Sequence, residues 1–129
     1  KDIIRPMLVA HGEIKRSLSN ERHWVNELYK ELAPEKINII TDIRFNEYEK
    51  DEVYWLKNEI NGVLIHISRY KEVDNKRVFM RPANEAESRN DPKLKLDSDF
   101  LLNWPTETDE EKQILNCRNL LKWVKNIYV

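Results

Sequence analysis

Glycine is almost absent from this sequence, which contains only Gly12 and Gly62. A phosphate-binding loop of the form GxxxxGK(S/T) needs glycines where the backbone wraps closely around phosphate groups. No stretch of the 129 residues has this form. The sequence as it stands therefore excludes a complete nucleotide site of the P-loop type.

Cysteine and long apolar runs are also scarce. The only cysteine, Cys117, excludes an internal disulfide and fits a reducing compartment. Because Cys117 falls in the apolar stripe of a predicted helix, we expect it in the core rather than as a reactive thiol. No apolar run approaches the ~20 residues that span a bilayer, and the first residues lack the apolar stretch of a signal peptide. We therefore expect a cytoplasmic protein without a membrane partner.

Charge of neither sign dominates the sequence. Charged residues make up 35% of the chain, yet the net charge is −1. Acidic and basic residues are interspersed, which is typical of a solvated surface and gives no reason to expect a nucleic-acid partner. At 129 residues, the chain is long enough for one domain with a real core.

The most informative segment is 37–70, where two short apolar runs flank an amphipathic stretch. The runs Ile37–Thr41 and Val63–Ile67 are rich in β-branched residues, which favours strands covered on both faces, as in a parallel sheet. Apolar residues between positions 53 and 60 recur at helical spacing, and Gly62 stands where a helix would end. The segment predicts a βαβ unit and an α/β fold.

Further elements are predicted on both sides of this unit. They are a helix over Asp2–Leu18, a helix between a cap at Ser19 or Asn20 and Pro34, a strand over Phe100–Trp104, and a last helix that begins at the capping box of Thr108 and Glu111. The polar segment Lys71–Asp99 has little apolar periodicity, so we expect a functional lid or a mobile loop there, with a short helix over Ala83–Arg89. The alternative for its central cluster is a capped turn.

Charged residues follow both predicted strands of the βαβ unit. Asp42 and Arg44 come after the first strand, and Arg69 follows the second. In open α/β sheets, ligands bind beyond the carboxyl ends of the strands, so these residues suggest a site for a metal–phosphate group. An aspartate there can hold Mg²⁺, and a guanidinium suits bidentate contact with phosphate. The alternative is that Asp42 caps a turn and Arg44 pairs with Glu47 or Glu49.

The histidines and tryptophans give weaker signals. His11, His23 and His66 have no metal-ligand spacing, and we expect His11 and His66 to be core histidines. No Ser-His-Asp or Cys-His arrangement follows from the spacing. The tryptophans all have apolar neighbours and are expected in the core; they are Trp24, Trp55, Trp104 and Trp123.

Four segments, read in order, resemble the deoxynucleoside monophosphate kinases encoded by bacteriophages. These segments are IRPMLVAHGEIKRSLSNERHWVNEL, IITDIRFNEYEKDEVYWLKNEINGVLIHISR, ANEAESRNDP and FLLNWPT. The resemblance runs from Ile4 to Thr106, and its most specific parts are Thr41–Phe45 with Glu47 and Asn84–Pro92. Such enzymes are P-loop kinases that transfer a phosphoryl group from ATP to a deoxynucleotide. The resemblance implies a three-layer P-loop-kinase-like core with a parallel sheet, with ATP and Mg²⁺ as cofactors.

The resemblance also implies roles for the residues that match the family's motifs. Asp42 resembles the acid near Mg²⁺, Arg44 a ligand of the acceptor monophosphate, and Arg69 a part of the lid that approaches the ATP phosphates. In similar kinases, a helical part such as residues 1–33 lines the monophosphate pocket. That part would contribute Arg5 and Arg16, with Trp24 on the base side of the pocket. Residues 71–99 resemble a lid over the ATP phosphates, with Arg81, Asn84, Glu85, Arg89, Asn90 and Asp91 as its candidate residues.

The sequence departs from this family at its start. The first strand and the GxxxxGK(S/T) loop would lie upstream of Lys1, and Lys1 is not an initiator methionine. We therefore expect a single domain, with a βαβ core at 36–70 and a final strand and helix at 100–129, that lacks the amino-terminal segment of such a kinase. It would be inactive unless an upstream P-loop completes it. The alternative is a relic that binds a nucleotide or a protein without catalysis, and a homodimer is also consistent with the resemblance.

Overall fold

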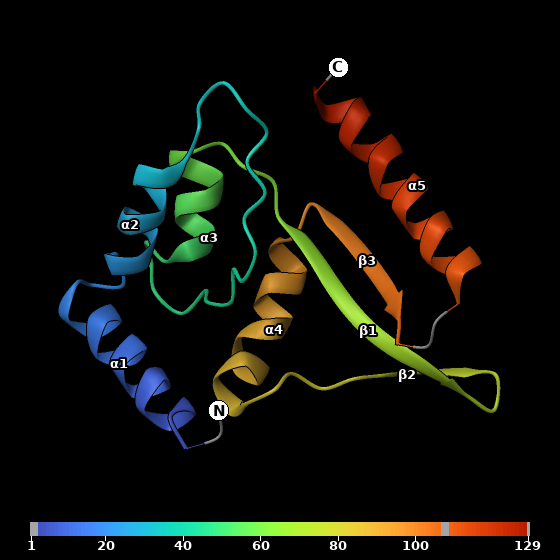
Figure 1. Ribbon diagram of the computed structural model, residues 1–129, viewed down its shortest axis with the longest axis horizontal. Helices are drawn as coiled ribbons and strands as arrows, with labels where there is room; N and C mark the ends of the chain where they lie inside the picture. The colour runs from blue at the N-terminus through green and yellow to red at the C-terminus, as the bar shows by residue number, and fades with distance from the viewer. Residues whose placement is uncertain (1–2, 107–108, 129) are drawn as a thin grey trace. The chain divides into compact units, whose positions relative to one another are not determined.

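The computed structural model describes residues 3–106 and 109–128. It is a mixed α/β structure with a small three-stranded sheet (Figure 1). Its contacts divide the chain into two compact parts, Lys1–Gly62 and Val63–Val129, which we call the amino-terminal and carboxy-terminal parts. In chain order the elements are α1 (Arg5–Leu18), α2 (His23–Glu31), α3 (Glu52–Tyr54), the π-helix η1 (Trp55–Glu59), β1 (Ile65–Val73), β2 (Lys76–Phe79), α4 (Glu85–Asp97), β3 (Phe100–Pro105) and α5 (Glu110–Tyr128).

The two predicted helices at the start of the chain form as α1 and α2. Pro6 lies in the first turn of α1, where its missing N–H costs no hydrogen bond. The hydroxyl of Ser19 accepts a hydrogen bond from the backbone N–H of His23 at 2.8 Å, at the start of α2. The prediction of a core position for His11 is wrong, because His11 is exposed on α1 together with the apolar residues near it.

The predicted strand over Ile37–Thr41 does not form. Residues 37–47 are all described, and none of them belongs to a helix or a strand. Ile37 and Ile39 are 82% and 87% exposed, although their residue types favour a buried strand. A strand is stabilised by backbone bonds and side-chain packing to its neighbours, and this segment pairs with no strand of the described chain.

The predicted helix before Gly62 forms as the short α3 followed by η1. The core of the amino-terminal part lies here: Trp55 is only 1% exposed, and Val53, Leu56 and Val25 are also buried. The last turn is wide, because the N–H of Ile60 donates to the carbonyl of Trp55 at 3.2 Å. This core is small, and Trp55 is its largest fully buried side chain.

Gly62 lies after the helix, as predicted, but for a different reason. The left-handed backbone conformation that glycine usually supplies at a helix end belongs to Asn61, with φ of 51°, and neither glycine has a positive φ. A Cβ atom at position 62 would lie 2.5 Å from Cδ1 of Leu56 and 3.1 Å from its carbonyl oxygen. Gly62 is therefore required by close packing.

Gly62→Ala is expected to destabilise the amino-terminal part by about 1–3 kcal/mol, as overpacking of a filled core does. The urea midpoint of unfolding measures the loss. Gly12→Ala is the matched control, because a Cβ atom at position 12 meets nothing within 4 Å. Alanine is favoured over glycine within a helix, so this control is expected to be neutral or slightly stabilising. Equal midpoints for the two variants would contradict the packing argument.

The carboxy-terminal part is built on the sheet, with strand order β2-β1-β3 (Figure 1). β1 and β3 are parallel, in a register that pairs Ile65 with Phe100 and Tyr70 with Pro105. This confirms parallel pairing of the second and third predicted strands. The sheet is nevertheless mixed rather than parallel, because β2 pairs antiparallel to the end of β1.

The prediction of a mobile loop over 71–99 with only a short helix at Ala83–Arg89 is wrong, because most of the segment forms regular structure. Its first residues continue β1 and turn back into β2 through Asp74 and Asn75, both of which have positive φ (50° and 59°). Aspartate and asparagine tolerate this conformation, which suits a two-residue hairpin turn. The rest of the segment forms α4. Asn84 caps this helix, since its side-chain oxygen accepts from the N–H of Glu87 at 2.9 Å, so the cluster belongs to a capped helix rather than to a capped turn on a loop.

The last helix, α5, packs on β3 through one face. The rings of Phe100 and Trp123 lie 4.9 Å apart, and the side chain of Asn116 donates to the carbonyl of Asn103 at 2.8 Å. The prediction of a core position for Cys117 is wrong, because it lies on the exposed side of α5. The predicted capping residue Thr108 lies outside the described residues. Among residues 3–106 and 109–128, no helix combines the length and apolarity needed to cross a membrane.

Candidate functional site

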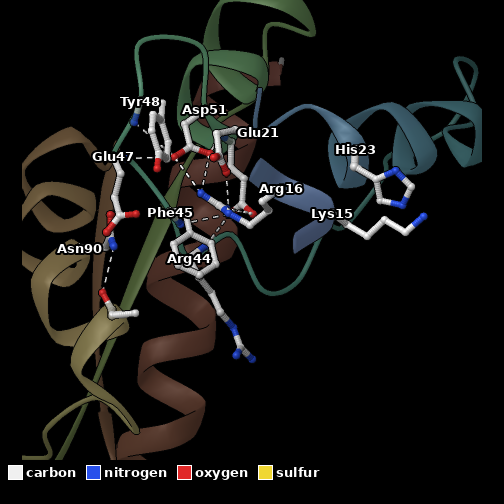
Figure 2. A network of polar contacts seen from close by, with 12 residues as sticks. Lys15, Arg16, Glu21, His23, Arg44, Phe45, Glu47, Tyr48, Asp51 and Asn90 are labelled. Carbon is white, nitrogen blue, oxygen red and sulfur yellow. Dashed lines mark hydrogen bonds and ion pairs between the residues drawn. The ribbon is translucent and has the colours of Figure 1, made fainter. Parts of the chain in front are cut away.

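The segment Asp42–Tyr48, which we call the 42–48 loop, is held by backbone hydrogen bonds to two carboxylates (Figure 2). The N–H groups of Arg44 and Phe45 donate to Oε2 of Glu52, at 2.7 Å and 3.0 Å. A carboxylate that accepts two backbone N–H groups fixes the direction of the chain as well as its position. The loop therefore has a defined shape although it contains no helix or strand.

Asp51 holds the second half of the same loop. Its Oδ2 accepts from the N–H of Glu47 at 3.0 Å and from that of Tyr48 at 3.4 Å, while its Oδ1 accepts from the N–H of Glu52 at 2.9 Å. The Asp51 side chain is fully buried. The last of these bonds makes Asp51 the N-cap of α3. The sequence analysis did not select Asp51 or Glu52, although an aspartate before an apolar helical repeat is a capping signal.

Arg16 lies behind these carboxylates, and only 7% of it is exposed. Its Nε is 2.7 Å from Oε2 of Glu21, and its terminal nitrogens lie 3.3 Å from Asp51 and 3.4 Å from Glu52. The guanidinium carbon is 3.8 Å from the centre of the Phe45 ring, a cation–π geometry (Figure 2). One cation from α1 thus faces three acids and the 42–48 loop.

Burial opposes the ionisation of two of these acids. The loss of solvent raises the pKa of Glu21 and that of Glu52 above the ordinary value of 4.5. The nearby Arg16 acts in the opposite direction on Glu21. The hydrogen bonds from Arg44 and Phe45 do the same for Glu52. The surplus of acids over cations in this cluster therefore carries an electrostatic cost.

Glu21 makes stability depend on pH in a predictable direction. Since its pKa is higher in the folded protein than in the unfolded chain, the folded state binds more protons between pH 4.5 and the raised value. The free energy of unfolding should therefore fall as the pH rises through this window. Glu21→Gln should remove that fall, so the variant gains stability over wild type on going from below pH 4.5 to neutral pH.

Urea midpoints measured across that range, followed by tryptophan fluorescence, check the prediction. Glu27→Gln is the control, because the hydrogen bond from Lys30 lowers the pKa of Glu27. The stabilising effect of Glu27 is lost as the pH falls, which is the opposite sign. A Glu21→Gln variant whose midpoint differs from that of wild type by the same amount at every pH would contradict the raised pKa.

Two predicted site residues lie together on the 42–48 loop. The guanidinium of Arg44 is 2.7 Å from Oδ1 of Asp42, and both side chains are exposed. Asp42 has a φ of 68°, in the left-handed region that aspartate tolerates better than most residues other than glycine. Residues in this region are retained where the surrounding structure holds them, and they are frequent at functional sites. The loop thus presents an acid and a guanidinium side by side to solvent.

Three other candidates belong to the amino-terminal part. Arg5 is exposed at the start of α1. Trp24 is 41% exposed on α2, with its ring edge-on to that of His23 at 4.6 Å, so the prediction that it belongs to the core is wrong. Arg16 contacts Glu52 and Asp51, the two acids that hold the 42–48 loop, as described above.

The remaining candidates belong to the carboxy-terminal part. Arg69 is exposed on β1, where its carbonyl accepts from the N–H of Met80 at 2.8 Å, and Arg81 follows β2. Glu85 and Arg89 are exposed on α4. Asn84 caps α4, as described above. These residues share one part of the chain, and the 42–48 loop belongs to the other.

Two of the lid candidates, Asn90 and Asp91, make side-chain contacts within the carboxy-terminal part. Asn90 is fully buried, and its side chain donates to the carbonyl of Ala86 at 2.9 Å. Oδ1 of Asp91 lies 2.9 Å from Nε2 of His66, whose Nδ1 lies 3.2 Å from the hydroxyl of Ser68. The prediction of a buried, hydrogen-bonded His66 is confirmed. The Ser68–His66–Asp91 contacts were not predicted, because they join β1 to α4 across the fold.

Asp42 is the predicted metal ligand of the site, and its side chain is exposed. In the part of the chain that the structure describes, no three histidine, cysteine, aspartate or glutamate residues form a group that could hold one. Mg²⁺ at phosphoryl-transfer sites takes one or two carboxylates and fills its other positions with water and phosphate oxygens. The exposed Asp42 fits the role of one such ligand. No family model, curated protein or solved structure matches this chain.

Proposed function

We propose that this chain is part of a deoxynucleoside monophosphate kinase, which passes a phosphoryl group from ATP to a deoxynucleotide when an upstream P-loop completes it. The observation that carries the proposal is the Asp42–Arg44 pair, 2.7 Å apart on a loop held by the carboxylates of Asp51 and Glu52. Such a pair offers an anchor for a cation and an anchor for phosphate within one loop.

The two side chains would act by exchanging partners. Arg44 would move from the Asp42 carboxylate to the oxygens of the acceptor monophosphate, where a guanidinium binds in bidentate fashion. The freed Asp42 would then hold Mg²⁺, which neutralises charge on the phosphate oxygens when it is bound. The exposure of both side chains permits this exchange without unfolding the loop.

The first test is the intact mass of the protein in its source, together with the coding sequence upstream of Lys1. A mass above 15.6 kDa and an upstream GxxxxGK(S/T) motif lead to an assay of the longer chain with ATP, Mg²⁺ and each of dAMP, dCMP, dGMP and dTMP. We expect at least one of them to be phosphorylated. A longer chain that carries the motif and binds no nucleotide would overturn the proposal.

A second candidate is supported by the exposed apolar segment. Ile37 and Ile39 are almost fully exposed. Contiguous apolar surface of this kind usually marks an interaction site. This favours a non-catalytic relic that binds a partner protein. A mass of 15.6 kDa, with no ATP turnover, would support this candidate. Binding of a dNMP by that chain, measured by calorimetry, would instead indicate a nucleotide-binding relic.

A further inference from the structure

The 42–48 loop directs four backbone N–H groups at two side chains that are adjacent in the sequence. Arg44 and Phe45 donate to Glu52, and Glu47 and Tyr48 donate to Asp51. Two neighbouring carboxylates at the start of α3 thus hold both ends of the turn that follows the Asp42–Arg44 pair. We call Asp51 and Glu52 the carboxylate clamp.

The clamp requires a cation, and the cation comes from another element. Two neighbouring acids repel each other, and the buried Asp51 contributes to raising the pKa of the half-buried Glu52. Arg16 lies within 3.4 Å of both acids and compensates their charge. Its remaining nitrogen, Nε, is engaged by Glu21, and Phe45 covers the face of its guanidinium.

We propose that Arg16 is a positioning residue that acts through the carboxylate clamp, and that it does not bind the monophosphate itself. This inference deepens the proposed function, on which its last step rests. A guanidinium that left three acids for a phosphate would strand buried carboxylates without a cation, which is strongly unfavourable. Arg44, which is exposed on the same loop, can reach a phosphate without that cost.

The clamp can be tested on the protein without any nucleotide, by amide hydrogen exchange. Glu52→Gln replaces the oxygen pair by an amide, and Arg16→Lys keeps a positive charge but loses the planar fork that meets several acids at once. In both variants we expect the amides of Arg44 and Phe45 to exchange about tenfold faster or more, as loss of a hydrogen bond to a charged group predicts. In Arg16→Lys, those of Glu47 and Tyr48 should follow.

Lys30→Met is the matched control for removing a cation from an ion pair. Lys30 pairs with Glu27 at 2.6 Å on the surface of α2, outside the clamp. In Lys30→Met, the hydrogen-exchange rates of the loop amides should equal those of wild type. Circular dichroism shows whether each variant is folded, and Glu52→Gln serves if Arg16→Lys does not fold. Unchanged exchange at all four loop amides in a folded variant would overturn the proposal.

The last experiment distinguishes a positioning role of Arg16 from direct binding of the monophosphate by Arg16. In any form of the protein that binds dAMP, dCMP, dGMP or dTMP, Arg44→Lys should weaken affinity while the Phe45, Glu47 and Tyr48 amides keep their slow exchange. Arg16→Lys should weaken affinity and speed exchange together. An Arg16→Lys variant that loses affinity with normal exchange would identify Arg16 as a direct ligand and refute positioning. If wild type binds none of the four deoxynucleotides, the kinase proposal fails. The hydrogen-exchange result then decides by itself whether Arg16 acts through the carboxylate clamp.

Discussion

Asp42→Asn is expected to reduce Mg²⁺-dependent turnover by about 10²-fold or more in a form of the protein completed by an upstream GxxxxGK(S/T) segment. Loss of one preorganised electrostatic group at a reacting phosphate has an effect of this order. Asparagine keeps the size of the side chain but loses the charge that attracts a cation. The measurement is kcat at saturating ATP and dNMP, over a range of Mg²⁺ concentrations.

The same substitution separates metal binding from phosphate binding. Asp42 is an ion-pair partner of Arg44, so its neutralisation removes one attraction that competes with phosphate for the guanidinium. The affinity for the monophosphate should therefore be kept or increased while turnover is lost. Glu49→Gln is the control, since it removes an exposed acid a few residues further along the chain. Normal turnover in Asp42→Asn, or equal losses of turnover in the two variants, would contradict a role of Asp42 in the reaction.

Trp55→Ala is expected to destabilise the amino-terminal part by about 3–5 kcal/mol, the usual cost of truncating a buried aromatic residue. Trp55 is 1% exposed and lies in a small core, so few neighbouring side chains can move into the space left behind. A loss of this size is a large fraction of the stability of an ordinary domain. Urea unfolding followed by far-ultraviolet circular dichroism measures it.

Trp24→Ala is the matched control, because it makes the same change in the same part of the chain. The Trp24 ring is largely outside the core and contacts the ring of His23. We expect it to cost about 1 kcal/mol or less, since an edge contact between rings contributes about that much. Similar losses for the two tryptophans would mean that the core does not centre on Trp55.

The sequence predicted the elements whose signals are local. The apolar run Phe100–Trp104 became β3, and the β-branched run Val63–Ile67 overlaps the start of β1, which runs on to Val73 and pairs with β3 in parallel register. The helix before Gly62 also formed where its spacing placed it. In each case the residues that carry the signal lie within one element, so no information about distant partners was needed.

Prediction failed where a neighbour decides the structure. Ile37–Thr41 has the composition of a strand, but strand formation depends on a partner that the described chain does not provide. The hairpin turn at Asp74 and Asn75 was missed because the flanking residues are polar and hide the alternation of a strand. Exposure of Cys117 likewise depends on what packs against α5, which its own helical stripe does not reveal.

The residues of the candidate site likewise divide into those that a local sequence signal reveals and those that depend on distant partners. Asp42 and Arg44 were selected because charged residues that follow an apolar run are visible in the sequence, and the structure places them in contact. Asp51 and Glu52 look like ordinary helix-cap residues in the sequence. Their second function, binding the loop in front of them, depends on Arg16 from a helix far upstream. Long-range pairs of this kind leave no periodic signal.

The pairing of β1 with two very different partners has a consequence for the order of folding. β2 follows β1 directly, whereas β3 is separated from β1 by β2 and all of α4. Contacts between residues close in sequence form sooner, because they close shorter loops. On the ribosome, the hairpin can form as soon as Phe79 has emerged, while the other edge of β1 must wait for Phe100. During that interval the edge of β1 is open to other nascent chains, so the speed of synthesis through α4 should influence how much of the protein aggregates.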